Sequence, residues 1–240
     1  MRRAAALAVV VAAVFAGAAA ARPGATITVY AAASLTEVFP HIDHRPRYEF
    51  AGSDQLAFQI QQGAPADVFA AASPKYPDQL YAQHLCSKPV VFATNTVVLI
   101  VPRANPAHIR SVTDLTRDGI RLVIGAKGVP IGDYTRKMLA ALGLSSALAN
   151  VVSEETDVKL VVAKVAFGEA DAGFVYRTDV QPVGNKVLRI QLPATAEPTV
   201  QYEACVPASA RHPREASAFV RALVARGARA KMRAAGFGLP

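Results

Sequence analysis

The sequence has no tryptophan, only two cysteines among its 240 residues, and no long apolar run after residue 21. Because a helix needs about 20 apolar residues to cross a bilayer, the rest of the chain is not predicted to contain a membrane span. Neither cysteine has a neighbouring cysteine or histidine at zinc-ligand spacing, which argues against a Cys-based metal site. The G-x-S-x-G motif of many serine hydrolases is also missing.

The first 21 residues have the pattern of a Sec-type signal peptide. Arg2 and Arg3 precede an apolar Ala/Val/Phe run, and the small residues GAAAA follow at 17–21. This pattern predicts cleavage near residues 19–21 and a periplasmic or otherwise exported protein. No cysteine stands at the predicted cleavage site, so a lipid anchor is not expected. We therefore exclude residues 1–21 from the predicted fold.

The formal net charge is +8, and much of the excess lies near the C-terminus. The basic residues there are dispersed and are not interleaved with aromatic residues. This distribution is typical of a solvated helix face and does not indicate a nucleic-acid partner.

Cys86 and Cys205 are the two cysteines. An exported protein meets oxidising conditions, so a single disulfide between them is the natural expectation. Two buried free thiols are the alternative.

Short apolar segments alternate with amphipathic ones through most of the chain. Such alternation predicts parallel sheets with helices on both faces, an α/β fold. Strands are predicted at 27–30, 48–50, 66–72, 121–124, 151–153, 172–176 and 186–191, and helices at 35–42, 75–83, 134–142, 158–167 and 213–229.

Two longer β segments, 89–102 and 200–206, are long enough to pass from one domain to another. They predict a first lobe made of residues 22–95 plus 204–240 and an inserted second lobe made of 96–203. Two α/β lobes joined by two strands form a hinged clamp. Both cysteines would then lie near the hinge on the side of the first lobe.

Five predicted strand-to-helix junctions or strand ends carry neutral hydrogen-bond donors. Ser34 follows the first strand and forms a capping-box pattern with Glu37, and Ser53 follows the second strand. The segments VPIGDY (129–134) and TDV (156–158) offer backbone amides at helix starts, and Tyr176 ends a strand. Each feature alone is explained by capping or a turn. Together they predict an oxyanion site, because amides at helix N-termini and hydroxyls stabilise an anion without a counter-charge.

The motifs at these junctions resemble those of the periplasmic molybdate-binding proteins of ABC transporters, in order and spacing. The resemblance covers essentially the whole mature chain, up to AAGF at 234–237. It rests on VYAAASLTE (29–37), FAGSDQLAFQIQQGAPADVFAAAS (50–73), GVPIGDYTRKML (128–139), EETDVK (154–159) and GFVYRTD (173–179).

The resemblance implies a two-lobed periplasmic-binding-protein fold of type II, with parallel-rich sheets and a two-strand hinge. It implies a monomer without a cofactor that binds molybdate, and also tungstate, as an oxyanion and delivers it to a membrane permease. The ligand would be held by the residues that match the family's binding positions, which are Ser34, Ser53, Ile131, Val158 and Tyr176.

Two acidic residues stand beside these positions. Asp54 lies where the family often has serine, and it would cap its helix, repel the anion, or act as an additional metal ligand as in some tungstate binders. Asp157 is the predicted cap of the helix that starts at Val158. Ile131 replaces a usually small residue, but its backbone amide would still be the donor.

Two alternative functions are compatible with parts of the sequence pattern. The first is a carrier of sulfate or another tetrahedral oxyanion, which belongs to the same class. The second is an exported serine hydrolase that uses Ser34 or Ser53. A nucleophilic serine needs a base, and the five histidines lie in predicted turns or loops away from the junctions. We therefore expect a binding protein and not an enzyme.

Overall fold

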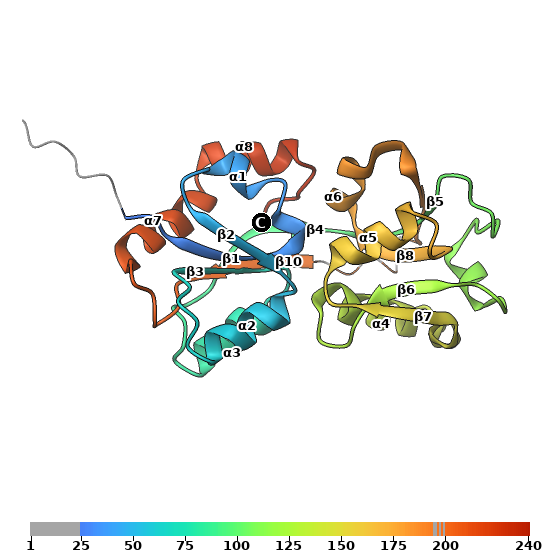
Figure 1. Cartoon of the computed structure of the whole chain (residues 1–240), viewed down its shortest axis with the longest axis horizontal. Coiled ribbons are helices and arrows are strands. Elements are labelled where there is room, and N and C mark those ends of the chain that lie inside the picture. The colour runs from blue at the N-terminus through green and yellow to red at the C-terminus, as the bar shows by residue number, and fades with distance from the viewer. Residues whose placement is uncertain (1–24, 194–195, 197, 199) are drawn as a thin grey trace, which may run out of the picture.

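The computed structural model describes residues 25–193, 196, 198 and 200–240. The predicted signal peptide lies outside these residues. The described chain forms two five-stranded sheets with flanking helices, and the two halves lie side by side (Figure 1). Among the described residues, no helix combines the length and apolar character needed to cross a membrane.

The first sheet has the strand order β2-β1-β3-β10-β4. Helices α2 and α3 cover one face, and α1, α7 and α8 cover the other (Figure 1). We call this half lobe I. Its strands are β1 (Thr28–Ala32), β2 (Arg47–Ala51), β3 (Val68–Ala71), β4 (Val90–Asn95) and β10 (Val200–Cys205), and its helices are η1 (Ala33–Leu35), α1 (Phe39–Ile42), α2 (Ser53–Gln61), α3 (Lys75–Ala82), α7 (Pro213–Leu223) and α8 (Arg226–Ala234).

The second sheet has the order β7-β6-β8-β5-β9. Helix α4 lies on one face, and α5 and α6 lie on the other (Figure 1). We call this half lobe II. Its strands are β5 (Val97–Pro102), β6 (Leu122–Gly125), β7 (Val151–Glu155), β8 (Ala172–Tyr176) and β9 (Val187–Ile190), and its helices are η2 (Val112–Thr116), α4 (Pro130–Ala141), η3 (Ser145–Asn150), α5 (Val158–Ala166), α6 (Arg177–Val180) and η4 (Gln181–Lys186).

Both sheets are mixed, whereas alternation alone predicts parallel pairing. In lobe I, β1 pairs in parallel with β2 and β3, while β10 is antiparallel to β3 and β4. In lobe II, β6 is parallel to β7 and β8, while β5 is antiparallel to β8 and β9. The antiparallel pairs involve β5 and β10, the strands that follow the passages between lobes. Thr96 alone separates β5 from β4, so no helical crossover imposes a parallel direction on β5.

The first passage between the lobes is short. Strand β4 ends at Asn95 and β5 begins at Val97, so Thr96 alone separates strands of different sheets. The second passage lies between β9 and β10. The predicted boundary between residues 203 and 204 falls inside β10, which pairs within the first sheet.

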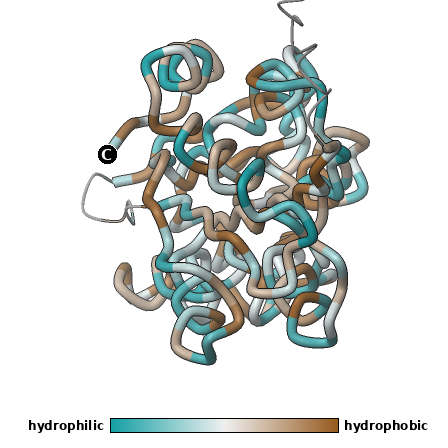
Figure 2. The backbone as a smooth tube through the Cα atoms, turned by 90° about the vertical axis from the view of Figure 1, so that its left-hand side faces the viewer, coloured by the Kyte–Doolittle hydropathy of each residue, from teal (hydrophilic) through white to brown (hydrophobic). Residues whose placement is uncertain are grey.

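The hydrophobic core continues through both lobes. Strands β3 and β5 are buried along their whole length, as expected for central apolar runs. Many of the outer turns are hydrophilic in the view of the backbone from the lobe I side (Figure 2).

The predicted disulfide is confirmed. Cys86 and Cys205 are bonded, with a Cα–Cα distance of 6.0 Å and a sequence separation of 119 residues. The prediction that they lie near the hinge is wrong. Val200, at the start of β10, pairs with Asn95 beside the passage, whereas Cys205 at its end pairs with Phe69. Because β10 runs away from the passage, the disulfide braces the distant end of lobe I.

Candidate functional site

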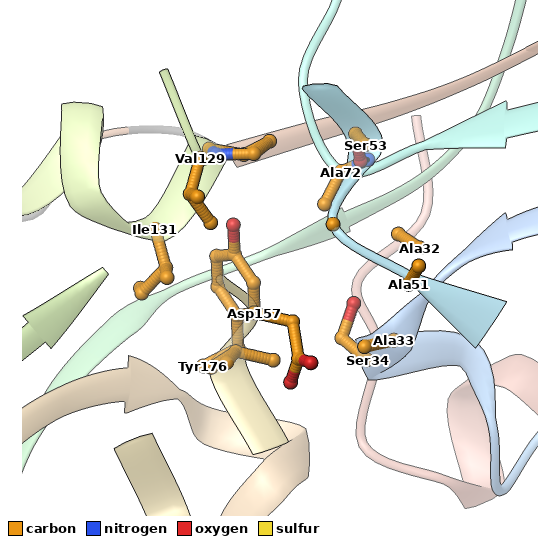
Figure 3. Close-up of a pocket in the computed structure, with 13 residues that line it drawn as sticks. Ala32, Ala33, Ser34, Ala51, Ser53, Ala72, Val129, Ile131, Asp157 and Tyr176 are labelled. Carbon is orange, nitrogen blue, oxygen red and sulfur yellow. The ribbon is translucent and has the colours of Figure 1, made fainter. Parts of the chain in front are cut away.

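A small cavity lies between the lobes, and all five predicted ligand contacts line it. Ser34 and Ser53 come from lobe I, and Ile131, Val158 and Tyr176 come from lobe II. Figure 3 shows the serines on one side, Ile131 on the other and the Tyr176 phenol between them. The cavity has about 20 Å³ open to the centre of a water-sized sphere, which suits a compact ligand of a few atoms. The other lining residues are Ala32, Ala33, Ala51, Gly52, Ala72, Val129, Pro130 and Asp157.

Ser34 does not cap a helix, so the capping-box prediction is wrong. The chain forms the short 3-10 helix η1 after β1, and α1 begins only at Phe39. Ser34 therefore lies inside η1, where Ala32 is the N-cap and no side chain caps. The Ser34 hydroxyl oxygen lies 2.8 Å from that of Tyr202, and the Glu37 carboxylate lies 3.8 Å from the Lys159 ammonium. Ser34 also lines the cavity.

Ser53 is the first residue of α2, as the strand-to-helix pattern predicts. The side chain is buried, and its oxygen accepts a hydrogen bond from the backbone amide of Ala72 at 3.2 Å. A hydroxyl that accepts one bond still has its hydrogen to donate. Ser53 can therefore donate into the cavity.

Ile131 and Val158 occupy the first turns of α4 and α5. First-turn amides have no acceptor inside their own helix, and the helix dipole adds partial positive charge there. At α5, the Asp157 carboxylate accepts from the amides of Lys159 at 2.7 Å and Leu160 at 3.2 Å, which confirms Asp157 as the cap. The cap does not engage the Val158 amide, and two helix N-termini of lobe II reach the cavity through these residues.

Tyr176 ends β8 and is only 1% exposed. Its hydroxyl oxygen is buried and has no hydrogen-bond partner among the described residues. Burial, with smaller contributions from Tyr202 and Tyr134, raises the pKa of Tyr176 well above its ordinary value, so the phenol keeps its proton. A buried donor without an acceptor costs about 1–3 kcal/mol. This arrangement indicates an acceptor supplied by a ligand.

The two acidic residues are placed differently. Asp157 lines the cavity, whereas Asp54 is not among the lining residues. Asp54 is half-buried, and one carboxylate oxygen has no partner within the described part of the chain. Burial raises the pKa of Asp54. The helix cap Asp157 is therefore the acidic residue that lines the cavity.

The cavity has no basic lining. None of its lining residues is lysine, arginine or histidine. Within the described residues, no group of three or more His, Cys, Asp or Glu side chains is arranged to hold a metal ion. Apart from Asp157, whose carboxylate caps α5, the polar groups of the lining are neutral donors, which suits an anion held by hydrogen bonds and helix dipoles.

Sequence reasoning missed Tyr202 and Asn95. Both are buried behind the cavity, and Asn95 is the last residue of β4. The one available signal was a tyrosine in an otherwise apolar β segment, because a buried phenol needs a hydrogen-bond partner. The sequence does not show that the partner is Ser34.

Several contacts join the lobes around the cavity. The Tyr76 hydroxyl donates to the carbonyl oxygen of Gly128 at 2.6 Å, and the Lys75 ammonium lies 2.8 Å from the Asp133 carboxylate. On the hinge side, the Arg177 guanidinium donates to the carbonyl oxygen of Gly236 at 2.6 Å. The structure therefore has the two lobes closed on each other.

The chain matches the family of bacterial extracellular solute-binding proteins over residues 20–238. It is 38% identical over 225 residues to the molybdate-binding protein ModA of Mycobacterium tuberculosis, an alignment that covers 90% of this chain and 85% of that protein. It is 35% identical over 201 residues to the molybdate-binding protein ModA of Escherichia coli, with 75% and 76% covered.

Solved structures show the same fold. The periplasmic molybdate-binding protein of Azotobacter vinelandii matches with a TM-score of 0.78 and 23% identity, covering 89% of this chain and 99% of that chain. The sulfate-binding protein SubI of Mycobacterium tuberculosis matches with a TM-score of 0.74 and 17% identity, covering 88% and 86%. These relatives are binding proteins and not enzymes. The chain therefore belongs to the bacterial extracellular solute-binding proteins, within the family of the molybdate-binding protein ModA.

Proposed function

We propose that this protein captures molybdate, and also tungstate, between its lobes and delivers the anion to the permease of an ABC transporter. The observation that carries the proposal is the buried Tyr176 hydroxyl, which has no acceptor in the described chain and lines a cavity that also receives neutral donors from both lobes. The ModA relatives, at 38% and 35% identity, support molybdate as the ligand.

In this proposal, Ser34, Ser53 and Tyr176 donate through their hydroxyls, and Ile131 and Val158 donate through their backbone amides. Charge-assisted bonds from neutral donors hold the dehydrated oxyanion, and the dipoles of α4 and α5 favour its charge. Because donors come from both lobes, the ligand stabilises the closed arrangement. Opening about the passages at Thr96 and between β9 and β10 would admit and release it.

The lobes would act as two domains, which the sequence divides into residues 22–95 plus 204–240 and residues 96–203. Because β10 pairs within the first sheet, we place the second boundary before Val200 instead of after residue 203. The signal-peptide pattern supports export to the periplasm, where the protein would act as a monomer without a cofactor. Asp54 and Asp157 would shape the field around the anion without contacting a free metal cation.

A carrier of sulfate is the second candidate, because sulfate has the same charge and a tetrahedral shape. The structural likeness to SubI concerns the fold alone. Metal–oxygen bonds are longer than sulfur–oxygen bonds, so cavity size would separate the two anions. The exported hydrolase is not favoured, since Ser34 pairs with Tyr202 and Ser53 with an amide, and no histidine lines the cavity among the described residues.

Isothermal titration calorimetry of the ligand-free mature protein tests the proposal. Sodium molybdate, tungstate and sulfate are titrated separately into the same preparation. We expect tight binding of molybdate and tungstate and much weaker binding of sulfate. Tight binding of sulfate with weak binding of molybdate would replace the proposal by the second candidate, and no response to any of the three would reject both.

A further inference from the structure

Four buried polar side chains form a chain of hydrogen bonds behind the cavity. The Ser34 hydroxyl lies 2.8 Å from the Tyr202 hydroxyl, and the Asn95 amide nitrogen lies 3.4 Å from the Tyr202 hydroxyl and 2.9 Å from the Thr178 hydroxyl. Their exposed fractions are 4% or less for Ser34, Asn95 and Tyr202, and 8% for Thr178. Because Thr178 belongs to lobe II and the other three residues belong to lobe I, this series of hydrogen bonds also connects the two lobes.

The orientation of the Asn95 amide is determined by its own backbone neighbour. The backbone N–H of Thr96 donates to the Asn95 side-chain oxygen at 2.9 Å. A backbone amide can only donate, so the atom that it meets must be the oxygen. The NH₂ group, which has two hydrogens and no acceptor capacity, therefore faces Thr178 and Tyr202.

This orientation determines where the hydrogen of Tyr202 points. Within the described chain, the hydroxyl of Tyr202 has two hydrogen-bond partners, the Asn95 side-chain nitrogen and the Ser34 hydroxyl oxygen. The nitrogen cannot accept, so the Ser34 oxygen is the acceptor. Burial raises the pKa of Tyr202 far above its ordinary value, so the phenol has a proton to donate.

We propose that Tyr202 and Asn95 are positioning residues that make Ser34 a donor to the bound oxyanion. Because Ser34 accepts from Tyr202, its own hydrogen is left for the cavity, which it lines. With the opposite direction, Ser34 would give its hydrogen to Tyr202 and present lone pairs to the anion. The inference rests on the proposed function, since it requires an anion in the cavity.

The test is a double-mutant cycle between Tyr202→Phe and Ser34→Ala, measured by calorimetry with sodium molybdate. We expect Tyr202→Phe to weaken binding about 5–30-fold in the otherwise unchanged protein, and less than about 2-fold when Ser34 is already alanine. A tyrosine that only packs against its neighbours would give the same loss in both backgrounds. Tyr48→Phe is the matched control, because its half-buried phenol donates to the backbone carbonyl oxygen of Asp43 in lobe I and does not line the cavity.

Asn95→Asp is the second variant, because it keeps the shape of the side chain and replaces the donor that faces Tyr202 and Thr178 by an acceptor. The carboxylate that this substitution introduces accepts the hydrogen of Tyr202, so Ser34 loses its donor. We expect a larger loss of molybdate affinity than with Tyr202→Phe, and a smaller loss in the Ser34→Ala background. Simple repulsion by the new charge would give equal losses in both backgrounds. Thermal unfolding of each ligand-free variant separates a folding defect from a binding defect.

The possible results separate a failure of this inference from a failure of the proposed function. If the unchanged protein binds molybdate and Tyr202→Phe binds it equally well, the inference is wrong and the proposed function stands. Equal losses with and without Ser34, for both Tyr202→Phe and Asn95→Asp, also overturn the inference. If the unchanged protein binds no molybdate, the proposed function fails first and the inference fails with it.

Discussion

The phenol of Tyr76 in lobe I donates a hydrogen bond to the carbonyl oxygen of Gly128 in lobe II, at 2.6 Å. The ammonium of Lys75, one residue earlier, lies 2.8 Å from the carboxylate of Asp133 in the same part of lobe II. The Lys75 side chain is half-exposed, so solvent screens this ion pair and the Tyr76 bond is the stronger restraint. Both contacts need the lobes to be together, so they stabilise the closed arrangement.

Tyr76→Phe should therefore weaken molybdate binding by about 3–10-fold, because it removes one hydrogen bond formed only on closure. Calorimetry of the variant and the parent protein measures the effect. Tyr81→Phe on the same helix is the control, because the Tyr81 side chain is 47% exposed. Equal affinities for Tyr76→Phe and the parent would show that this bond does not contribute to closure.

Gly52→Ala should block full closure. A Cβ atom at Gly52, the N-cap of α2, would lie against the backbone carbonyl oxygen of Thr156 in lobe II. A backbone atom cannot move aside as a side-chain tip can, so we expect a loss of affinity of about 10-fold or more while lobe I stays folded. The measurement is calorimetry with molybdate, supported by small-angle X-ray scattering of the ligand-bound state.

Gly227→Ala is the matched control for that substitution. Gly227 lies in α8, and within the described chain no atom outside its own helix backbone and chain neighbours lies within 4 Å of the position that its Cβ would take. We expect unchanged affinity and a free energy of unfolding raised by roughly 0.5 kcal/mol, because alanine favours the helix. If Gly52→Ala closes and binds like Gly227→Ala, the close approach to Thr156 is not a constraint on closure.

Tyr176→Phe should separate binding from stability. Its hydroxyl has no protein acceptor in the described chain, so removing it deletes a buried unpaired donor and should leave the ligand-free protein at least as stable. Molybdate affinity should fall by about 1–3 kcal/mol, because one donor to the charged ligand is lost. Chemical denaturation without ligand and calorimetry with molybdate provide the two values. A loss of stability with unchanged affinity would show that the phenol serves the fold.

Asp179 should make stability fall as pH rises. Its carboxyl is fully buried, and burial raises its pKa to about 6, although the Lys159 ammonium at 3.3 Å acts in the opposite direction. That ammonium is close enough for an ion pair but is not aligned for a hydrogen bond to the carboxylate oxygen. From about pH 4 to pH 6 the unfolded chain has lost this proton while the folded protein still holds it. Each rise in pH in that window therefore lowers the free energy of unfolding.

Asp179→Asn has no titrating proton, and comparison with it isolates this effect from other carboxyl groups. We expect the parent protein to lose on the order of 2–3 kcal/mol relative to the variant between pH 4 and pH 7. Urea denaturation at pH 4, 5, 6 and 7 measures the difference. A difference that does not change with pH would mean that Asp179 titrates at its ordinary value.

Loss of the disulfide should destabilise the protein without changing the binding cavity. The bond between Cys86 and Cys205 spans 119 residues, and the chain-entropy model gives such a loop about 5 kcal/mol. The double substitution Cys86→Ser with Cys205→Ser should lower the free energy of unfolding by about that amount. Affinity at low temperature should be nearly unchanged, because the bond lies at the end of β10 away from the passage. A large loss of affinity in folded protein would contradict this separation.

Local patterns predicted several elements well. Asp157 caps α5 through two amides, as a carboxylate before an apolar periodic segment predicts. The amphipathic segment at 213–229 is helical in its first part, but α7 ends at Leu223 and α8 begins at Arg226. Hydrophobic periodicity continues across this break, so it does not show where the chain turns to pack against α1.

The motifs also identified residues that the structure brings together. Ser34, Ser53 and Tyr176 line one cavity, although they lie far apart in the chain. Their spacing in the sequence does not show how far apart they lie in space. Their grouping came from the resemblance of whole motifs to a known family and from the rule that ligands bind at strand ends near helix N-termini.

The stretch at Ile27–Glu37 shows what local sequence pattern determines and what tertiary structure adds to it. By itself, the sequence determined a buried strand with a serine shortly after its carboxyl end, because alternation and composition act over a few neighbouring residues. Tertiary structure alone decided what that serine does. Its partner is Tyr202, 168 residues away, and the direction of their bond depends on the amide of Asn95 beside the interlobe passage. Hydrogen-bond partners so distant in sequence are set by the packing of the sheets, which no local pattern encodes.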